Sequence, residues 1–302
     1  MKEKLKSILI VSTSYIIAAI LTIILLPLML VMIAYRKVKK SNNIKSRKIM
    51  KGGEPFFYKR GKIGVLLIHG FTSTPQELGY LAKYLASKNI SVMAPLLAGH
   101  GRSPEVMLKT SSEDWINSAK KAHIELKKHC DTTFIGGSSL GGNIAAILEK
   151  SCKPSGLILL AMPAYFSREL KIRLFVPSFP ILKRIKQTMR KSHLKHHKEI
   201  MEEKVHYKVL PIGNLKDAYE LTKKTREILP SIKTPTIVIQ SDNDWQFGKS
   251  NAKYIYENLG SKLKKLYFIK DSYHVFILDS KRETSFKYIY SFIKEVLKKK
   301  DI

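Results

Sequence analysis

The stretch that most constrains the fold is residues 134–144, where a short apolar run meets a glycine cluster and continues into helical sequence. Residues 137–141 read Gly-Ser-Ser-Leu-Gly, the G-x-S-x-G pattern of a sharp turn between a strand and a helix. Such a turn needs glycine on both sides, because a side chain there would collide with the neighbouring strand or helix. The pattern predicts Ser139 at the tip of the turn, open to solvent. A glycine-rich turn with incidental serines would have the same five-residue pattern. Further motifs in the chain are therefore needed to identify Ser139 as a nucleophile.

Apolar runs alternate with amphipathic stretches along most of the chain. We expect strands at residues 63–68, 90–96, 133–136, 156–161, 236–240 and 266–269. Helices are expected between most of them, and a last helix at about 280–299. Strands that are apolar throughout and alternate with helices indicate a parallel sheet covered on both faces. The predicted class is therefore α/β, with a mostly parallel, doubly wound sheet.

One segment, at about residues 164–230, interrupts this alternation. It is helical in character, and we expect no strand in it; residues 164–200 hold ten Lys and Arg against two acidic residues. In doubly wound folds, an insertion after a strand lies over the crevice where ligands bind. We expect a cap there, either a solvated lid or a basic surface that touches lipid.

The N-terminal region predicts a membrane anchor. Residues 7–35 contain no charged residue, and they exceed the roughly 20 apolar residues that a bilayer requires. A cleaved signal peptide is disfavoured because its apolar region is about 7 to 15 residues long. A basic juxtamembrane linker is expected at 36–55 and the globular domain at 56–302. The more basic flank follows the span, so the positive-inside rule predicts a single-pass protein of the cell membrane whose C-terminal domain is cytoplasmic.

Charge and composition limit the partners. The 302 residues carry a net charge of +30, and an anionic membrane surface explains this more simply than nucleic acid, for which we find no binding module. A solvated lysine-rich face is the alternative. The two cysteines exclude a disulfide-stapled fold. We find no metal-ligand spacing, phosphate loop or dinucleotide motif, so we predict neither metal nor cofactor.

A serine nucleophile needs a base, and the base needs an acid to orient it. Ser241-Asp242-Asn243-Asp244 and Asp271-Ser272-Tyr273-His274 each follow a late predicted strand, which gives the chain order serine, acid, histidine. His274 is the candidate base. The loop favours Asp244 as the acid, with Asp242 as the alternative.

Two backbone N–H groups, those of Leu140 and Phe71, are the candidate donors to an oxyanion. His100, between two glycines, is expected to shape its loop. Other histidines, including His123 and His206, lie in helical or insertion sequence and are expected at the surface.

The chain from about residue 61 to 298 resembles bacterial carboxylesterases and monoacylglycerol lipases of the α/β-hydrolase fold. The shared motifs are His69-Gly70-Phe71-Thr72-Ser73-Thr74-Pro75, Gly99-His100-Gly101, Asp114-Trp115, the serine turn followed by Gly142, and Ser272-Tyr273-His274-Val275 with Leu278-Asp279. The resemblance implies the same five site residues and the cleavage of short acyl esters or monoacylglycerols through an acyl-enzyme. Leu140, where methionine is common, and Trp245-Gln246 after the acid depart from the family and put the substrate in doubt.

Two other functions stay open. One is thioester hydrolysis or acyl transfer by the same residues. The other is a membrane-bound scaffold without catalysis, whose basic segment binds lipid or a protein partner.

Overall fold

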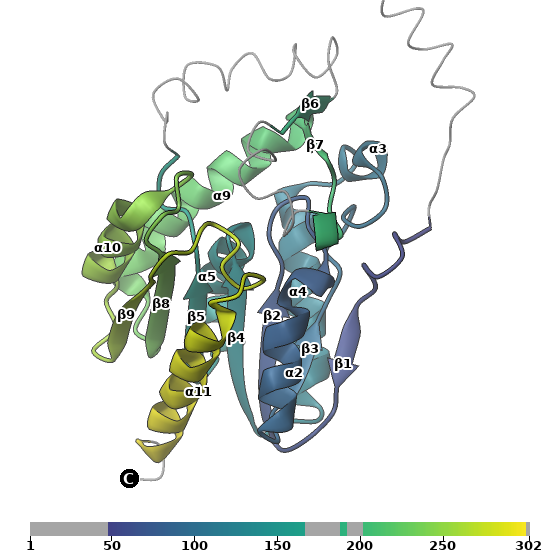
Figure 1. Cartoon of the computed structure of the whole chain (residues 1–302). Coiled ribbons are helices and arrows are strands. Elements are labelled where there is room, and N and C mark those ends of the chain that lie inside the picture. Colours follow the sequence, from purple (N-terminus) through teal and green to yellow (C-terminus); the bar gives the residue numbers. More distant parts are fainter. Residues whose placement is uncertain (1–47, 167–187, 192–201, 300–302) are drawn as a thin grey trace, which may run out of the picture.

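The computed structural model describes residues 48–166, 188–191 and 202–299 (Figure 1). Its centre is a sheet of seven strands, and a separate pair of short strands lies in the inserted segment. The sheet contains β1 (Phe56–Tyr58), β2 (Ile63–Ile68), β3 (Ser91–Ala94), β4 (Thr132–Ser138), β5 (Gly156–Leu160), β8 (Thr236–Ser241) and β9 (Lys264–Ile269).

The strand order is β1-β3-β2-β4-β5-β8-β9, and every pairing is parallel except that of β1 with β3. Register is clear at the centre, where Val65 of β2 lies opposite Phe134 of β4. The order reverses direction between β2 and β4, and the carboxyl ends of parallel strands share one edge of the sheet. The predicted α/β class with a mostly parallel sheet is confirmed.

Helices cover both faces of the sheet (Figure 1). The longer helices are α2 (Gly79–Ser87), α4 (Ser112–Lys127), α5 (Leu140–Cys152), α9 (Leu215–Ile228), α10 (Gly248–Asn258) and α11 (Arg282–Lys298), and the short α3 (Pro104–Met107) contacts β7. Alternate residues of β2 enter different cores: Leu66 and Ile68 pack with α4 and α5, whereas Val65 and Leu67 pack with α2 and α11. Successive side chains of a strand point to opposite faces of the sheet, so this alternation shows that β2 is buried on both faces.

Helix α4 begins with a capping box, in which the Ser111 hydroxyl accepts from the Asp114 N–H and the Asp114 carboxylate accepts from the Ser111 N–H. Trp115, in the first turn, is buried and donates its indole N–H to the Thr110 hydroxyl at 3.0 Å. The helix start thereby fixes an aromatic ring against the loop that follows β3.

Three details differ from the sequence expectations. Strand β1 was not expected, because three residues at a sheet edge carry too short a pattern. The inserted segment was expected to hold no strand, yet β6 (Thr188–Arg190) pairs with β7 (Val209–Pro211). Helix α9, within the range expected for the insertion, packs against α5, which itself contacts β4 and β5.

Within the described parts of the chain, every helix is too short or too polar to cross a bilayer. The span predicted at residues 7–35 lies outside the described residues, as do much of the linker and residues 167–187 and 192–201 of the insertion.

Candidate active site

Ser139 lies in a strained turn between β4 and α5. Its backbone has φ 52° and ψ −121°, a conformation that residues with a side chain rarely adopt. A Cβ on Gly137 would lie 2.1 Å from the carbonyl carbon of Gly141, and a Cβ on Gly141 would lie 2.1 Å from the carbonyl oxygen of Ile68. The Ser139 N–H donates to the Leu160 carbonyl oxygen at 2.8 Å. Glycine is required on both sides, and the turn presents the serine at the carboxyl edge of the sheet.

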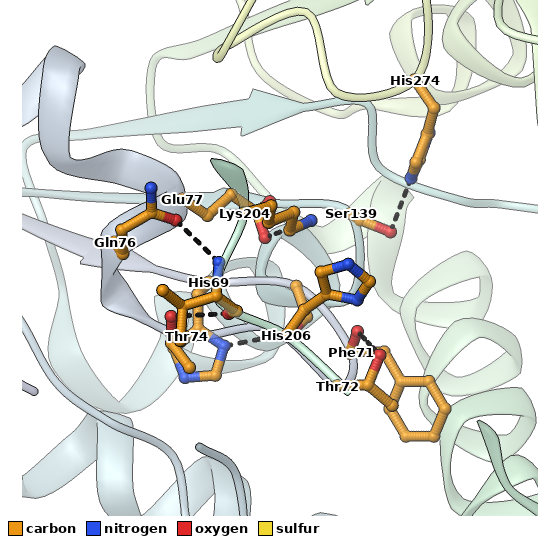
Figure 2. Close-up of polar contacts among 12 residues, drawn as sticks. His69, Phe71, Thr72, Thr74, Gln76, Glu77, Ser139, Lys204, His206 and His274 are labelled. Atoms are coloured by element: carbon orange, nitrogen blue, oxygen red, sulfur yellow. Dashed lines mark hydrogen bonds and ion pairs between the residues drawn. The ribbon is translucent and has the colours of Figure 1, made fainter. Parts of the chain in front are cut away.

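The structure brings Ser139, His274 and Asp244 together from three separate loops. His274 Nε2 lies 3.2 Å from the Ser139 hydroxyl oxygen, and His274 Nδ1 lies 2.7 Å from Asp244 Oδ2. Figure 2 shows the His274 ring and the Ser139 hydroxyl facing each other. The carboxylate that contacts the histidine is that of Asp244, although Asp242 is only two residues away. This chain of contacts suits transfer of the serine proton to Nε2.

Asp244 is held in place by donors on both of its oxygens. Oδ1 accepts from the backbone N–H groups of Gln246 at 2.8 Å and Phe247 at 3.2 Å, and Oδ2 accepts from Gln240 Nε2 at 2.6 Å. Burial alone would raise the pKa of the Asp244 carboxyl, but the charge and hydrogen bond of His274 and the two backbone donors hold it below its ordinary value. The ionised carboxylate keeps a proton on His274 Nδ1 and leaves Nε2 free to accept.

The loop that carries Phe71 approaches the serine closely. A Cβ on Gly70 would lie 3.4 Å from Ser139 Cβ and 3.4 Å from the carbonyl oxygen of Ser138. Leu140 is the first residue of α5, so its N–H is among the donors that have no partner within the helix. The two backbone groups expected to bind an oxyanion thus lie on segments adjoining Ser139.

A buried lysine contacts the loop behind Phe71. Thr72, at φ 61°, donates its hydroxyl to the Phe71 carbonyl oxygen at 2.6 Å and accepts from Lys191 Nζ at 2.6 Å. The Thr72 carbonyl accepts from the Tyr207 N–H at 2.9 Å. Burial, with repulsion from Lys204, lowers the pKa of Lys191 to about 7. The inserted segment therefore holds the strained residue next to Phe71 in place.

An ion pair joins the same loop region to the insertion. Glu77 is buried, and its carboxylate lies 2.9 Å from Lys204 Nζ (Figure 2). Burial would raise the pKa of Glu77, yet the attraction of Lys204 and further hydrogen bonds lower it to about 2. Next to it, the Gln76 side chain accepts from the Val205 N–H at 3.2 Å. Neither the ion pair nor Lys191 was expected from the sequence, because no local pattern links them.

Several histidines are buried without contacting Ser139. The expectation that His123 and His206 lie at the surface is wrong: His123 Nε2 lies 3.0 Å from the Thr133 hydroxyl, and His206 Nδ1 lies 2.8 Å from the Tyr207 carbonyl oxygen. Burial lowers the pKa of His123 to about 4. His123 thus contacts β4, and His206 also lies 3.2 Å from Lys191 Nζ; the helical and basic context of the two residues did not reveal these contacts.

His69 and His100 form an uncharged pair behind the Phe71 loop. Their ring centroids lie 5.0 Å apart, and His69 Nε2 accepts from the Leu97 N–H at 3.1 Å. Burial lowers the pKa of His69 to about 4 and that of His100 well below its ordinary value. Both rings are neutral at pH 7 and are buried among the loops after β2 and β3. His100 was expected to shape its loop, and its buried position agrees with that role.

Aromatic rings form an apolar wall beside His274. The ring centroid of Phe247 lies 5.1 Å from that of His274 and 5.8 Å from that of Phe166, which in turn lies 6.2 Å from Tyr219. Such a wall suits an apolar group on a substrate. The described residues contain no group of three His, Cys, Asp or Glu side chains that could hold a metal ion.

Comparison with known proteins gives concordant matches. Residues 60–281 match the model of the family described as serine aminopeptidase, S33 (Hydrolase_4). The chain is 30% identical over 241 residues to the thermostable monoacylglycerol lipase of Bacillus sp. (strain H-257), which covers 76% of this chain and 90% of the lipase. It is 28% identical over 244 residues to the carboxylesterase of Bacillus subtilis (strain 168), covering 80% and 97% of the two chains. A solved structure from work on the metagenome-derived lipolytic enzymes LipS and LipT superposes with a TM-score of 0.73 at 25% identity, covering 82% of this chain and 100% of the other.

Proposed function

The chain belongs to the S33 serine hydrolase family and has the α/β-hydrolase fold, and from this premise we propose that it hydrolyses carboxylic esters at Ser139. The observation that carries the proposal is the continuous contact from Ser139 through His274 to Asp244. Relatives named monoacylglycerol lipase and carboxylesterase support esters as the substrate class.

The geometry suits a two-step acyl transfer. The Ser139 oxygen attacks the ester carbonyl while His274 Nε2 accepts the serine proton and then returns it to the departing alcohol. Water attacks the acyl-enzyme with the same help from His274, which releases the carboxylic acid and restores the serine. Asp244 stabilises the imidazolium form of His274 in each step. The N–H groups of Leu140 and Phe71 bind the oxyanion, with Gly70 permitting the close approach of the second.

Short acyl esters or monoacylglycerols are the proposed substrates. The wall formed by Phe166, Tyr219 and Phe247 offers apolar contact next to the reacting atoms. Each methylene group buried there contributes about 0.8 kcal/mol of binding free energy.

The proposed enzyme is anchored in the cell membrane by residues 7–35, with the catalytic domain in the cytoplasm. The support is the uncharged stretch of 29 residues and the more basic flank that follows it. The basic linker at 36–55 and the insertion add attraction to anionic lipid.

A substrate panel tests the reaction. Purified protein is assayed on p-nitrophenyl esters of increasing length, on monoacylglycerols, on an acyl-CoA and on an amino-acid p-nitroanilide. We expect the esters to be the preferred substrates, with activity lost in Ser139→Ala and retained in Ser250→Ala, which removes an exposed hydroxyl from α10. If the acyl-CoA were the preferred substrate, the enzyme would be a thioesterase; if the anilide were preferred, it would be a peptidase. Equal activity of Ser139→Ala and wild type would refute the proposal.

A further inference from the structure

The described chain begins at the edge of the sheet that carries Ser139. The Met50 N–H donates to the Gly101 carbonyl oxygen at 2.7 Å, and a Cβ on Gly53 would lie 3.0 Å from Thr74 Cγ2. Gly101 lies in the loop after β3 and Thr74 in the loop after β2, both at the carboxyl edge of the parallel strands. Ser139 follows β4 at this same edge. The polypeptide therefore enters the domain on the face that holds the site.

The connection from the proposed anchor to this face is short. Residues 36–47 separate the proposed span at 7–35 from the first described residues, and twelve residues reach at most about 40 Å when fully extended. From β3, where the chain enters, to β9 the sheet is five strand spacings wide, or about 24 Å. The whole carboxyl edge is thus within reach of the bilayer that the anchor crosses.

Two aromatic side chains at this edge, in the loops of Asp244 and His274, are partly exposed. Trp245 directly follows Asp244 and is 47% exposed, and Tyr273 directly precedes His274 and is 39% exposed. Their loops are joined by a hydrogen bond of 3.1 Å from the Asn243 N–H to the Ser272 carbonyl oxygen. Tryptophan and tyrosine are the side chains enriched at membrane–water interfaces, where one end of the ring is apolar and the other is wet.

We infer that the carboxyl edge of the sheet rests on the lipid bilayer, with Trp245 and Tyr273 in the headgroup region, so that the ester substrate reaches Ser139 from the membrane. The occupant of this surface is the bilayer that residues 7–35 cross. The net charge of +30 adds attraction to an anionic lipid surface. This inference rests on the proposed function and its anchor, and it names the membrane as the source of the substrate.

Tryptophan fluorescence offers a direct test, because the full sequence contains two tryptophans and the other one, Trp115, is fully buried. Full-length protein is reconstituted in phosphatidylcholine–phosphatidylglycerol vesicles, with lipids brominated just below the headgroups in one sample and unmodified in the other. We expect bromination to quench the wild type and to leave Trp245→Phe, which retains Trp115 alone, almost unaffected.

A comparison of rates provides the second arm. Turnover of a monoacylglycerol embedded in the vesicles is divided by turnover of a water-soluble p-nitrophenyl ester. We expect this ratio to fall at least about fivefold in Trp245→Ser. We expect no change in Ile124→Ser, which removes an exposed apolar side chain near the C-terminal end of α4, where the chain returns to the start of β4 at the opposite edge of the sheet.

Fluorophosphonate labelling of Ser139 in the same vesicles separates the two hypotheses. Labelling without quenching, or a ratio that Trp245→Ser leaves intact, overturns the membrane-facing orientation and keeps the proposed reaction. Quenching without labelling supports the orientation and counts against the proposed reaction.

Discussion

The substitution Asp244→Asn is predicted to abolish nearly all turnover while preserving the fold. The backbone N–H groups of Gln246 and Phe247 both point at Oδ1, so the asparagine amide must place its oxygen there. Its NH₂ group then occupies the position of Oδ2, facing His274 Nδ1. Because an NH₂ group is only a donor, His274 turns to the tautomer with the proton on Nε2, which cannot accept the proton of Ser139.

The expected loss in kcat is about 10⁴-fold, or about 5 kcal/mol of transition-state stabilisation. The fold survives because the Gln240 amide can rotate and offer its oxygen to the new NH₂ group, which preserves the hydrogen bond now made at 2.6 Å. KM is expected to change little, since Asp244 is buried and contacts His274 rather than a bound ester.

Steady-state kinetics on a soluble p-nitrophenyl ester measures the effect, with circular dichroism and the midpoint of thermal unfolding reporting the fold. Asp242→Asn is the matched control, and we expect it to retain at least about half of the wild-type kcat. An Asp244→Asn variant with more than a tenth of wild-type activity would refute the reasoning. So would an Asp242→Asn variant as inactive as Asp244→Asn.

Three further predictions concern the framework of the site. Gly141→Ala is expected to yield little folded protein, because its Cβ meets the Ile68 carbonyl oxygen at 2.1 Å and backbone cannot easily give way; a wild-type unfolding midpoint would contradict this. Lys204→Met is expected to lower the free energy of unfolding by about 3 to 5 kcal/mol, because it leaves the Glu77 carboxylate buried without its ion-pair partner. Urea denaturation measures this change, and Lys208→Met, at an exposed position, is the control. His123 has a pKa near 6.5 in the unfolded state and about 4 in the folded state, so the free energy of unfolding of the wild type falls as pH falls. Between pH 7 and 5 we expect this free energy to fall by about 2 kcal/mol less in His123→Gln than in the wild type. Equal losses in the two proteins would refute this.

Local sequence patterns predicted the elements that depend on neighbours in the chain. The apolar runs predicted as strands at 63–68 and 236–240 form the buried strands β2 and β8, and the glycine spacing around Ser139 forms the strained turn. The loops holding Asp244 and His274 follow late strands, and parallel strands bring such loops to one edge. The sequence favoured Asp244 and kept Asp242 as the alternative, because the turn alone decides which of the two side chains faces His274.

The sequence did not reveal the contacts that join distant segments. Lys191 meets Thr72 across 119 residues, within a strongly basic segment where one lysine looks like any other. The ion pair of Glu77 with Lys204 likewise joins distant segments: Glu77 lies just after β2, and Lys204 lies in the insertion. Burial of these charges depends on how the insertion packs on the loop after β2, which no periodicity encodes. The short strands β6 and β7 depend on the same packing.

The most direct test of the account locates the reactive serine. Full-length protein is treated with a fluorophosphonate, digested, and the modified peptide sequenced by mass spectrometry, with His274→Ala and Asp244→Asn labelled in parallel. We predict one adduct, on Ser139, whose formation is slowed at least about 100-fold in both variants. An adduct on another serine, or an enzyme that hydrolyses esters while Ser139 stays unmodified, would contradict it.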